Sequence, residues 1–454
     1  MAGPAPLRLA RQFIYAARVH SAPDYDVAVI GAGIAGLAAC VLLRQQGLRV
    51  VCLDAQTFPH HKVGESLDWS SPGLLRRLGI DTGSLITDGI ATYKKKISAY
   101  DVGTPGWTVA PPEQIRRRPL RFETVTLHVD RAALDQRVYE RALALGTAFI
   151  WERVTRVEAD GERIAGCVTD SGRQISARWY IDASGTARLF SRELQIPVTS
   201  YGQAKVCLWT YFDTPPLHDG TAFFIDNRDD YLNWIWDIPV SPAQTSVGFV
   251  VTADRVREQR KAGDTVEAIL AKELRRHGRF DALLDAHPAL TVESTSFQSS
   301  VTSRVCGANW LMAGEAAAMP DPLTGNGLTS GIRHARWAVD VIRAAGASDA
   351  IPPAQRRAYA RQVFRLGRSF NSHIERAIYR PQMRQALGFK SATYIYTFFA
   401  FFMNALYARF DPRGPFGTAV FGLLFTIARI WMAGWTLVSR TVLLVRRPAL
   451  DSQR

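Results

Sequence analysis

Cysteine is scarce in this chain and never clusters. The five cysteines include no Cys-x-x-Cys pair. Disulfide frameworks and structural zinc sites both need closely spaced cysteines, so the sequence argues against the first and predicts no metal site. We expect buried thiols in a reducing compartment, and therefore a cytoplasmic protein: Cys40, Cys52, Cys167, Cys207 and Cys306.

Acidic side chains are absent from the first 23 residues, which also lack a long apolar run. Without that run, a secretory signal is not expected. The basic residues Arg8, Arg11 and Arg18 leave two alternatives open, a transit peptide and a plain extension. Residues 1–23 are therefore interpreted only as an N-terminal extension.

Acidic residues are also rare after Ala354. This segment has sixteen Lys and Arg against three acids, so it carries +13 of the total net charge of +14. Segregated positive charge favours an acidic partner, either an anionic membrane or an acidic protein. A solvated basic helix face is the alternative. No nucleic-acid partner is expected.

The same segment contains two apolar stretches, Ser391–Ala408 and Gly414–Val445. The second is interrupted by Arg429 and Arg440. The first is barely long enough to cross a bilayer, and arginine inside a bilayer is costly. We expect amphipathic helices that pack on the body or lie on a membrane surface, which would make the protein peripheral at a membrane.

A dinucleotide-binding fingerprint lies near the N-terminus. The buried strand Asp24–Ile30 leads into Gly-Ala-Gly-Ile-Ala-Gly, a helix follows, and Asp54 ends a second strand. Gly31 allows the tight turn, Gly33 lets the backbone approach a pyrophosphate, and Gly36 allows close helix packing. The carboxylate of Asp54 is placed to bind ribose hydroxyls.

Two later segments distinguish FAD from NAD. Trp179–Gly185 ends in Asp-Ala-Ser-Gly, and Leu311–Gly327 is a strand, an acid and a Gly-rich turn. They resemble the FAD motifs of the para-hydroxybenzoate-hydroxylase-like superfamily, in which Asp usually stands where this chain has Glu315. The resemblance implies FAD as cofactor and these binding residues: Arg131, Asp182, Gly185, Glu315, Pro322, Thr324, Gly325, Asn326 and Gly327.

Three more segments narrow the resemblance, which covers about residues 24–345. His61–Ser66 resembles the Gly-Glu-Ser segment of flavin-dependent halogenases and of geranylgeranyl-reductase-like enzymes. Asn233–Pro239 fits the Trp-x-Trp-x-Ile-Pro motif of halogenases, and Thr92–Ser98 lies where tryptophan halogenases carry a catalytic lysine. By this resemblance Lys94 is the catalytic candidate.

Both candidate sites have a structural alternative. Lys94 begins a run of three lysines, which is also typical of a solvated strand end. Trp234 and Trp236 alternate on a strand, so both point to one face, where they either bind substrate or fill the core.

The turn Pro322–Gly327 departs from the halogenase pattern. Tryptophan halogenases have Glu after Pro-Leu, where this chain has Thr324, and Thr-Gly-Asn-Gly is closer to the reductase-like branch. The carboxylate thought to assist indole halogenation is therefore missing, which weakens the case for halogenation.

The predicted fold class is α/β, in which an FAD-binding, glutathione-reductase-like Rossmann domain carries an inserted mixed β-sheet substrate domain and a C-terminal helical tail. Residues 24–200 and 296–350 are assigned to the FAD domain, 201–295 to the substrate domain and 351–454 to the tail. The dense aromatics of the substrate domain suit a flat hydrophobic substrate.

The leading hypothesis is an FAD-dependent monooxygenase that hydroxylates an electron-rich aromatic, an indole or phenol or a tryptophan within an acidic protein, through a flavin C4a-hydroperoxide. Halogenation that uses Lys94 and reduction of a prenyl substrate are the alternatives. No separate nicotinamide domain is visible, so either NAD(P)H binds transiently or a flavin reductase supplies electrons.

Overall fold

The fold is described from a computed structural model, which covers residues 23–57, 62–68, 70–102, 106–109, 126–216, 218–395 and 415–451. The predicted N-terminal extension, apart from Pro23, lies outside these residues. Most of the apolar stretch Ser391–Ala408 also lies outside them.

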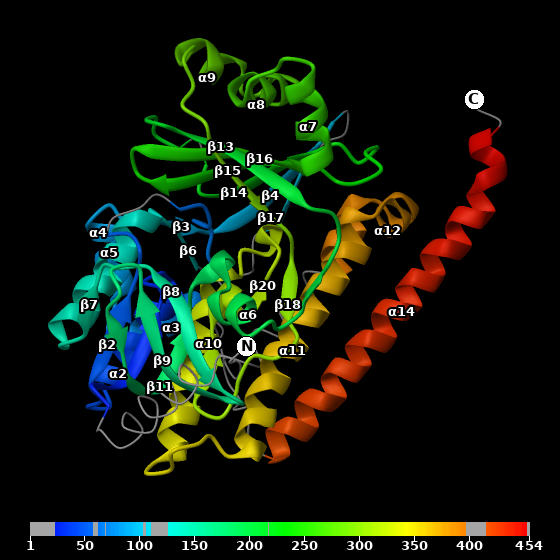
Figure 1. Ribbon diagram of the computed structural model, residues 1–454. Helices are drawn as coiled ribbons and strands as arrows, with labels where there is room; N and C mark the ends of the chain where they lie inside the picture. The colour runs from blue at the N-terminus through cyan, green and yellow to red at the C-terminus, as the bar shows by residue number, and fades with distance from the viewer. Residues whose placement is uncertain are drawn as a thin grey trace, which may run out of the picture.

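A five-stranded parallel sheet forms the base of the molecule (Figure 1). Its strands are mainly apolar, as expected for a sheet covered on both faces. Because the strands are parallel, their carboxyl ends meet along one edge. The order is β19 (Trp310–Met312), β11 (Ala177–Asp182), β1 (Tyr25–Ile30), β2 (Val50–Leu53) and β7 (Ala148–Ile150).

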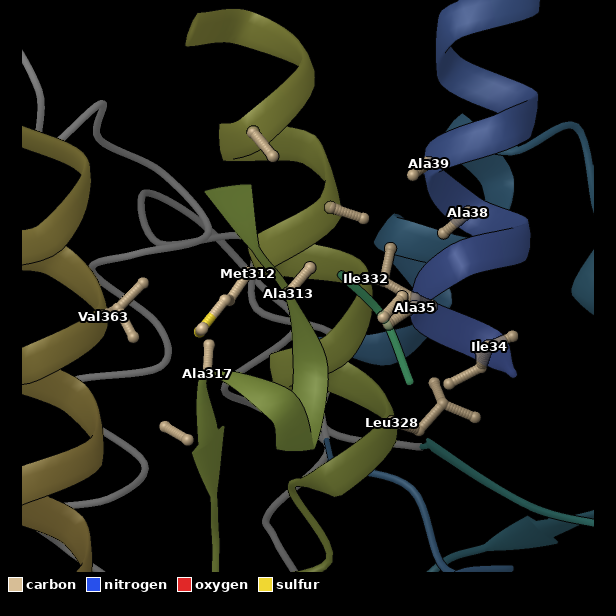
Figure 2. Packing of buried hydrophobic residues seen from close by; sticks show 14 of the residues in the cluster. Ile34, Ala35, Ala38, Ala39, Met312, Ala313, Ala317, Leu328, Ile332 and Val363 are labelled. Carbon is tan, nitrogen blue, oxygen red and sulfur yellow. The ribbon is translucent and has the colours of Figure 1, made fainter. Parts of the chain in front are cut away.

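Two helices cross this sheet in close contact, α2 (Ile34–Arg44) and α10 (Gly327–Ala345). Small side chains allow the approach, since a Cβ on Gly331 would lie 3.3 Å from the Ala35 Cβ. Figure 2 shows Ala35 and Ala38 of α2 facing Ile332 of α10. The packing fixes the amino ends of both helices at the carboxyl edge of the sheet.

A seven-stranded sheet lies above this edge (Figure 1). It corrects the predicted boundaries, because β4 and β5 belong to it although they fall within the predicted FAD segment 24–200. β4 pairs in parallel with β14, a partner far along the chain that local sequence patterns do not reveal. The order is β17 (Glu293–Phe297), β13 (Lys205–Phe212), β16 (Gln244–Thr252), β15 (Trp234–Ser241), β14 (Gly220–Ile225), β4 (Lys96–Asp101) and β5 (Trp107–Val109).

The remaining strands form three smaller sheets, and the remaining helices pack around the sheets. Helices α7 (Ala253–Lys261), α8 (Val266–Arg275) and α9 (Asp281–Ala286) lie beside the larger sheet. The others are α3 (Ser71–Arg77), α4 (Thr82–Thr87), β3 (Ala91–Lys94), β6 (Thr126–Val129), α5 (Arg131–Ala144), β8 (Val154–Asp160), β9 (Arg163–Thr169), β10 (Gln174–Ile175), α6 (Leu189–Glu193), β12 (Val198–Ser200), β18 (Ser300–Thr302) and β20 (Ala318–Met319). The orders in the smaller sheets are β10-β9-β8, β12-β18-β20 and β3-β6.

The C-terminal region is only partly a tail. Helix α11 (Pro353–Ile374) packs so closely on the body that a Cβ on Gly367 would lie 2.8 Å from Val301. A π-helical turn, η5 (Glu375–Tyr379), and α12 (Pro381–Leu387) follow. The predicted segment 351–454 is therefore divided, and its first part belongs to the folded core. Helix α14 (Pro415–Asp451) runs beside α11 and α12 (Figure 1).

Candidate active site

A cavity of about 870 Å³ separates the carboxyl edge of the parallel sheet from the seven-stranded sheet. Gly31 and Gly33 of the fingerprint and the Thr324–Gly327 turn line this cavity. Lys94, Trp234 and Trp236 line the same cavity. The structure thus brings most of the predicted cofactor residues and the predicted substrate residues to one space.

The three fingerprint glycines have three different surroundings. Gly31 has φ +102°, and a Cβ there would lie 2.3 Å from the Ala183 carbonyl oxygen. A Cβ on Gly36 would lie 1.8 Å from the Gly31 carbonyl oxygen. A Cβ on Gly33 would meet only the Lys62 Nζ, at 4.0 Å, because Gly33 faces the open cavity. Gly31 and Gly36 shape the turn, and Gly33 leaves the space that a pyrophosphate requires.

Asp54 ends β2 at the cavity wall. Its Oδ2 accepts a hydrogen bond from the Ala32 amide at 2.6 Å, and its Oδ1 accepts one from the Gln56 amide at 3.0 Å. The carboxylate is therefore held at the strand end where a Rossmann domain binds ribose.

Two charged residues, Arg131 and Glu315, line the cofactor side of the cavity. The Arg131 side chain is 10% exposed and is paired with Asp135, with 3.1 Å between Nη2 and Oδ2. Burial raises the pKa of the Glu315 carboxyl, and the positive charges of Arg131, Arg188 and Lys62 oppose that rise. Both Arg131 and Glu315 line the cavity, as an FAD site requires.

Asp182 was expected to contact FAD directly, but the structure gives it a different role. It is fully buried and does not line the cavity. Its carboxylate accepts hydrogen bonds from the Ser184 amide at 2.9 Å and the Phe190 amide at 2.8 Å. Asp182 positions the loop that carries Gly185, and Gly185 does line the cavity.

The Gly-rich turn stands at the amino end of α10. Gly325 has φ +62°, and Pro322, Thr324, Asn326 and Gly327 also line the cavity. A helix amino end favours negative charge, so the turn suits the pyrimidine edge of a reduced isoalloxazine. Together with the open cradle at Gly33, these residues fit FAD.

A buried ion pair supports this turn. Lys205 Nζ lies 3.0 Å from Asp321 Oδ2, and both side chains are about 2% exposed or less. Asp321 also accepts hydrogen bonds from the Leu323 amide at 3.1 Å and the Tyr379 hydroxyl at 2.7 Å. Sequence patterns did not indicate this pair, because its members lie on distant segments.

Lys94 is buried at the end of β3, unlike the lysines that follow it. Its side chain is 9% exposed, whereas Lys95 is 59% exposed and contacts Asp219 on the surface. Burial lowers the pKa of Lys94 from 10.5 to about 8, and the charge of Asp68 opposes that shift. The alternative of a solvated strand end is therefore wrong for Lys94.

A chain of hydrogen bonds leads away from Lys94. Lys94 Nζ donates to Ser66 Oγ at 2.8 Å, Ser66 Oγ lies 3.3 Å from Thr221 Oγ1, and Thr221 Oγ1 lies 2.8 Å from His128 Nε2. Burial and the charges of Lys94 and His218 lower the pKa of His128, so its imidazole is neutral near pH 7. Ser66 fell within the noted Gly-Glu-Ser segment, but only the fold shows the contacts of Ser66, Thr221 and His128.

Glu65 holds one of the two tryptophans in place. Its Oε1 accepts hydrogen bonds from the Tyr211 hydroxyl and the Ser246 hydroxyl, each at 3.0 Å. Trp236 Nε1 donates in turn to Ser246 Oγ at 3.0 Å. A Cβ on Gly248 would lie 2.2 Å from the Trp236 ring, so this glycine makes room for it.

The second tryptophan is held from the C-terminal region. Trp234 Nε1 donates to the Tyr379 hydroxyl at 3.0 Å, and Ile378 of the same π-turn lines the cavity. The Trp234 and Trp236 ring centroids are 5.8 Å apart. Both rings are buried in the core and also line the cavity. The two alternatives for these tryptophans, a core role and a place in the substrate site, are therefore compatible.

All five cysteines are free and buried, which confirms the prediction from their spacing. Among the residues that the structure describes, no group of three His, Cys, Asp or Glu side chains is placed to hold a metal ion. The chemistry of the site therefore depends on the residues that would hold FAD, on Lys94, and on the rings of Trp234 and Trp236.

The family described as "FAD binding domain" matches residues 24–346, so this chain belongs to that family of FAD-dependent oxidoreductases. The match confirms FAD as the cofactor. It also confirms the α/β flavoprotein class. The match does not test the division of the chain into an inserted domain and a tail.

Curated relatives carry more than one activity. The chain is 24% identical to a 1H-pyrrole-2-carbonyl-[peptidyl-carrier protein] brominase of Pseudoalteromonas luteoviolacea, over 71% of this chain and 78% of the relative. It is 27% identical to a menaquinone reductase of Mycolicibacterium smegmatis, over the same two shares. Among solved structures, the flavin-dependent brominase Bmp2 shares the fold, with a TM-score of 0.64, 20% identity and coverage of 95% of this chain and 100% of that chain.

Proposed function

We propose that this protein halogenates an electron-rich aromatic ring, with Lys94 as the catalytic side chain. The observation that carries the proposal is that the Lys94 amine is buried in the cavity. The Thr324–Gly327 turn and the rings of Trp234 and Trp236 line the same cavity. Sequence patterns placed hydroxylation first, because Thr324 replaces a carboxylate. The burial of Lys94 in this cavity is our reason for placing halogenation first.

One cavity would serve both halves of the reaction, the formation of the halogenating agent and its transfer to the ring. When bound and reduced by NAD(P)H or by a flavin reductase, FAD would supply two electrons, with which O₂, a halide ion and a proton would give hypohalous acid and water. The Ser66 carbonyl oxygen lies 3.0 Å from where a Cβ on Gly325 would stand, and Ser66 Oγ contacts Lys94. Ser66 therefore connects the cofactor turn to the amine.

Lys94 passes the halogen on in two balanced steps. Its neutral amine attacks hypohalous acid, so an N–halogen bond forms and water leaves. The aromatic ring then takes the halogen, and its displaced proton returns to the amine. A pKa of about 8 leaves a useful fraction of neutral amine at physiological pH, and the Ser66–Thr221–His128 chain offers a path for protons.

Trp234 and Trp236 orient the substrate. Their rings form a rigid apolar wall, because each indole N–H is bonded to a fixed hydroxyl. Flat aromatic rings pack favourably against such a wall in offset or edge-to-face geometry. An indole, a phenol or a pyrrole fits this chemistry, free or attached to a protein, as the substrate of the brominase relative is to its carrier protein.

Hydroxylation is the second candidate, favoured by Thr324. In that case the ring receives oxygen directly and Lys94 is dispensable. Mass spectrometry of products separates the two, with the FAD-loaded protein, reduced flavin, O₂ and an aromatic panel, with and without bromide. A bromide-dependent product with the bromine isotope pattern supports the proposal. A product that gains one oxygen, with bromide making no difference, contradicts it.

The menaquinone reductase relative raises a third activity, reduction of a prenyl substrate. The same assay includes a prenylated quinone under anaerobic conditions. Reduction of that substrate, with no aromatic product in air, would replace the halogenase proposal.

A further inference from the structure

A second cavity, of about 630 Å³, lies between the C-terminal helices and away from the active site. Arg376 and Arg380 of the π-turn segment line one side, and Arg440 of α14 lines the other. Thr436 and Ser439 stand on the α14 side as well. We refer to this space as the arginine cleft.

The arginine cleft carries excess positive charge, because only one of its three arginines is paired with a carboxylate among the described residues. Arg380 is paired with Glu375, with 3.2 Å between Nε and Oε1. Within the described part of the chain, no carboxylate lies within ion-pair distance of Arg376 or Arg440. Guanidinium groups bind phosphate oxygens in bidentate geometry, so three of them around one opening favour a phosphate ligand.

Helix α14 places an apolar surface beside the cleft. One face packs on the body through the buried side chains of Phe421, Phe425 and Met432. At 3.6 residues per turn, Ile430 and Leu437 point to the opposite side. Large apolar side chains on that side are 44–74% exposed: Leu423, Ile427, Ile430, Leu437, Val438, Leu444 and Val445.

The flanks of the same helix match a membrane interface. Arg429 and Arg440 are eleven residues apart, about three turns, so they lie on one flank of α14. Trp431 and Trp435 are half-buried, with ring centroids 6.5 Å apart. Basic and indole side chains beside an apolar strip are typical of helices that lie in the headgroup region.

Ala419–Val445 is the one stretch of the described residues long and apolar enough to cross a bilayer, and 22% of its most apolar part is buried. However, one face of α14 packs on the folded body along much of its length, so lipid cannot surround the helix there. The contact with α12 therefore favours a helix that lies in the plane of the membrane.

We propose that the arginine cleft binds the phosphate headgroup of an anionic phospholipid while the exposed face of α14 lies among the acyl chains. The inference concerns a site outside the active cavity, so it stands whether or not the ring is halogenated. In this proposal the excess positive charge of the C-terminal region serves to bind an anionic membrane. Arg376, Arg380 and Arg440 make the contact with the headgroup.

Vesicle cosedimentation of the full-length FAD-loaded protein tests the cleft. We expect binding to vesicles that contain phosphatidylglycerol and much weaker binding to phosphatidylcholine alone. Arg376→Gln with Arg440→Gln should weaken binding to the anionic vesicles by roughly tenfold. Lys261→Gln with Lys272→Gln removes the same charge from exposed positions on α7 and α8, and should change binding less than twofold. Equal effects of the two double variants would overturn the headgroup site.

The apolar face has its own matched pair. Ile430→Asn should weaken binding to the vesicles, whereas Leu143→Asn, which changes a side chain of comparable exposure on α5, should not. Two soluble probes complete the test, glycerol phosphate and an acidic carrier protein. Saturation of the cleft by free glycerol phosphate without vesicle binding would overturn the lipid assignment. So would association with the carrier protein in the absence of any vesicle binding.

Discussion

Lys94 Nζ donates a hydrogen bond to Ser66 Oγ across 2.8 Å, and the Ser66 main chain lies against Gly325 of the cofactor turn. The relationship links a residue at the end of β3 to the turn that begins α10. It places a buried amine beside the turn that would hold the flavin ring, which is the basis for assigning chemistry to Lys94.

The rate of product formation should depend on pH through Lys94. Burial lowers its pKa to about 8, and only the neutral amine attacks an electrophilic halogen. We expect the single-turnover rate of halogen transfer to rise with pH and to level off above about pH 8. Rapid-quench measurements from pH 6.5 to 9.5 check this. A rate that is flat across the range would remove the titrating amine from the mechanism.

The same burial predicts an unusual stability effect. The pKa of Lys94 is lower in the folded chain than its ordinary value of 10.5, so the unfolded chain binds more protons between about pH 8 and 10.5. The free energy of unfolding therefore rises with pH across this window. Lys94→Met removes the buried charge and should stabilise the protein at pH 7, by on the order of 1–3 kcal/mol.

Chemical denaturation at pH 7 and pH 10 measures that effect, and the gain should shrink at the higher pH. Lys95→Met is the control, because Lys95 is exposed and should show no pH-dependent gain. Destabilisation of Lys94→Met at pH 7 would mean that the hydrogen bonds of Lys94 outweigh its desolvation.

Gly33→Val should abolish FAD binding and leave the fold intact. A Cβ at Gly33 meets nothing closer than 4.0 Å in the protein, but the branched side chain would occupy the pyrophosphate space. Flavin absorbance after desalting and a circular dichroism spectrum report the two properties. Gly434→Val, an open position on α14, should keep its FAD. A Gly33→Val protein with stoichiometric FAD would show that the cradle is misassigned.

Ser246→Ala should loosen the tryptophan wall. It leaves the buried Trp236 Nε1 without its acceptor, so we expect a loss of about 1–3 kcal/mol in the free energy of unfolding. The KM for the aromatic substrate should also rise, while FAD stays bound. Ser241→Ala, at the end of β15, the strand that carries Trp236, is the control. Equal KM values for Ser246→Ala and wild type would mean that Trp236 packs in the core and does not contact the substrate.

Local patterns predicted the cofactor side of the site well. The roles of Gly31, Gly33 and Gly36 follow from backbone geometry over a few residues, and the structure places each accordingly. The alternation of Trp234 and Trp236 also predicted a shared face, because strand side chains repeat every two residues. These features depend on short-range geometry that a sequence displays directly.

Features that depend on distant partners escaped prediction. Asp182 was expected at the cofactor, but its carboxylate is used by the loop amides of Ser184 and Phe190. Nothing local distinguishes Lys94 from Lys95, and burial separates them only once β3 pairs with β6. Likewise, Tyr379 reaches Trp234 from a segment predicted as tail.

The central claim is that Lys94 acts on the oxidant between flavin and substrate, and the coupling of bromide oxidation to product tests it most directly. Reduced FAD-loaded protein is mixed with O₂, bromide and an accepted aromatic, and flavin reoxidation and brominated product are measured in one reaction. A scavenger of free hypobromous acid is present in every reaction. For Lys94→Ala we predict reoxidation at the wild-type rate, loss of the brominated aromatic product, and hypobromous acid captured by the scavenger. Wild-type yields of product from Lys94→Ala would contradict the account.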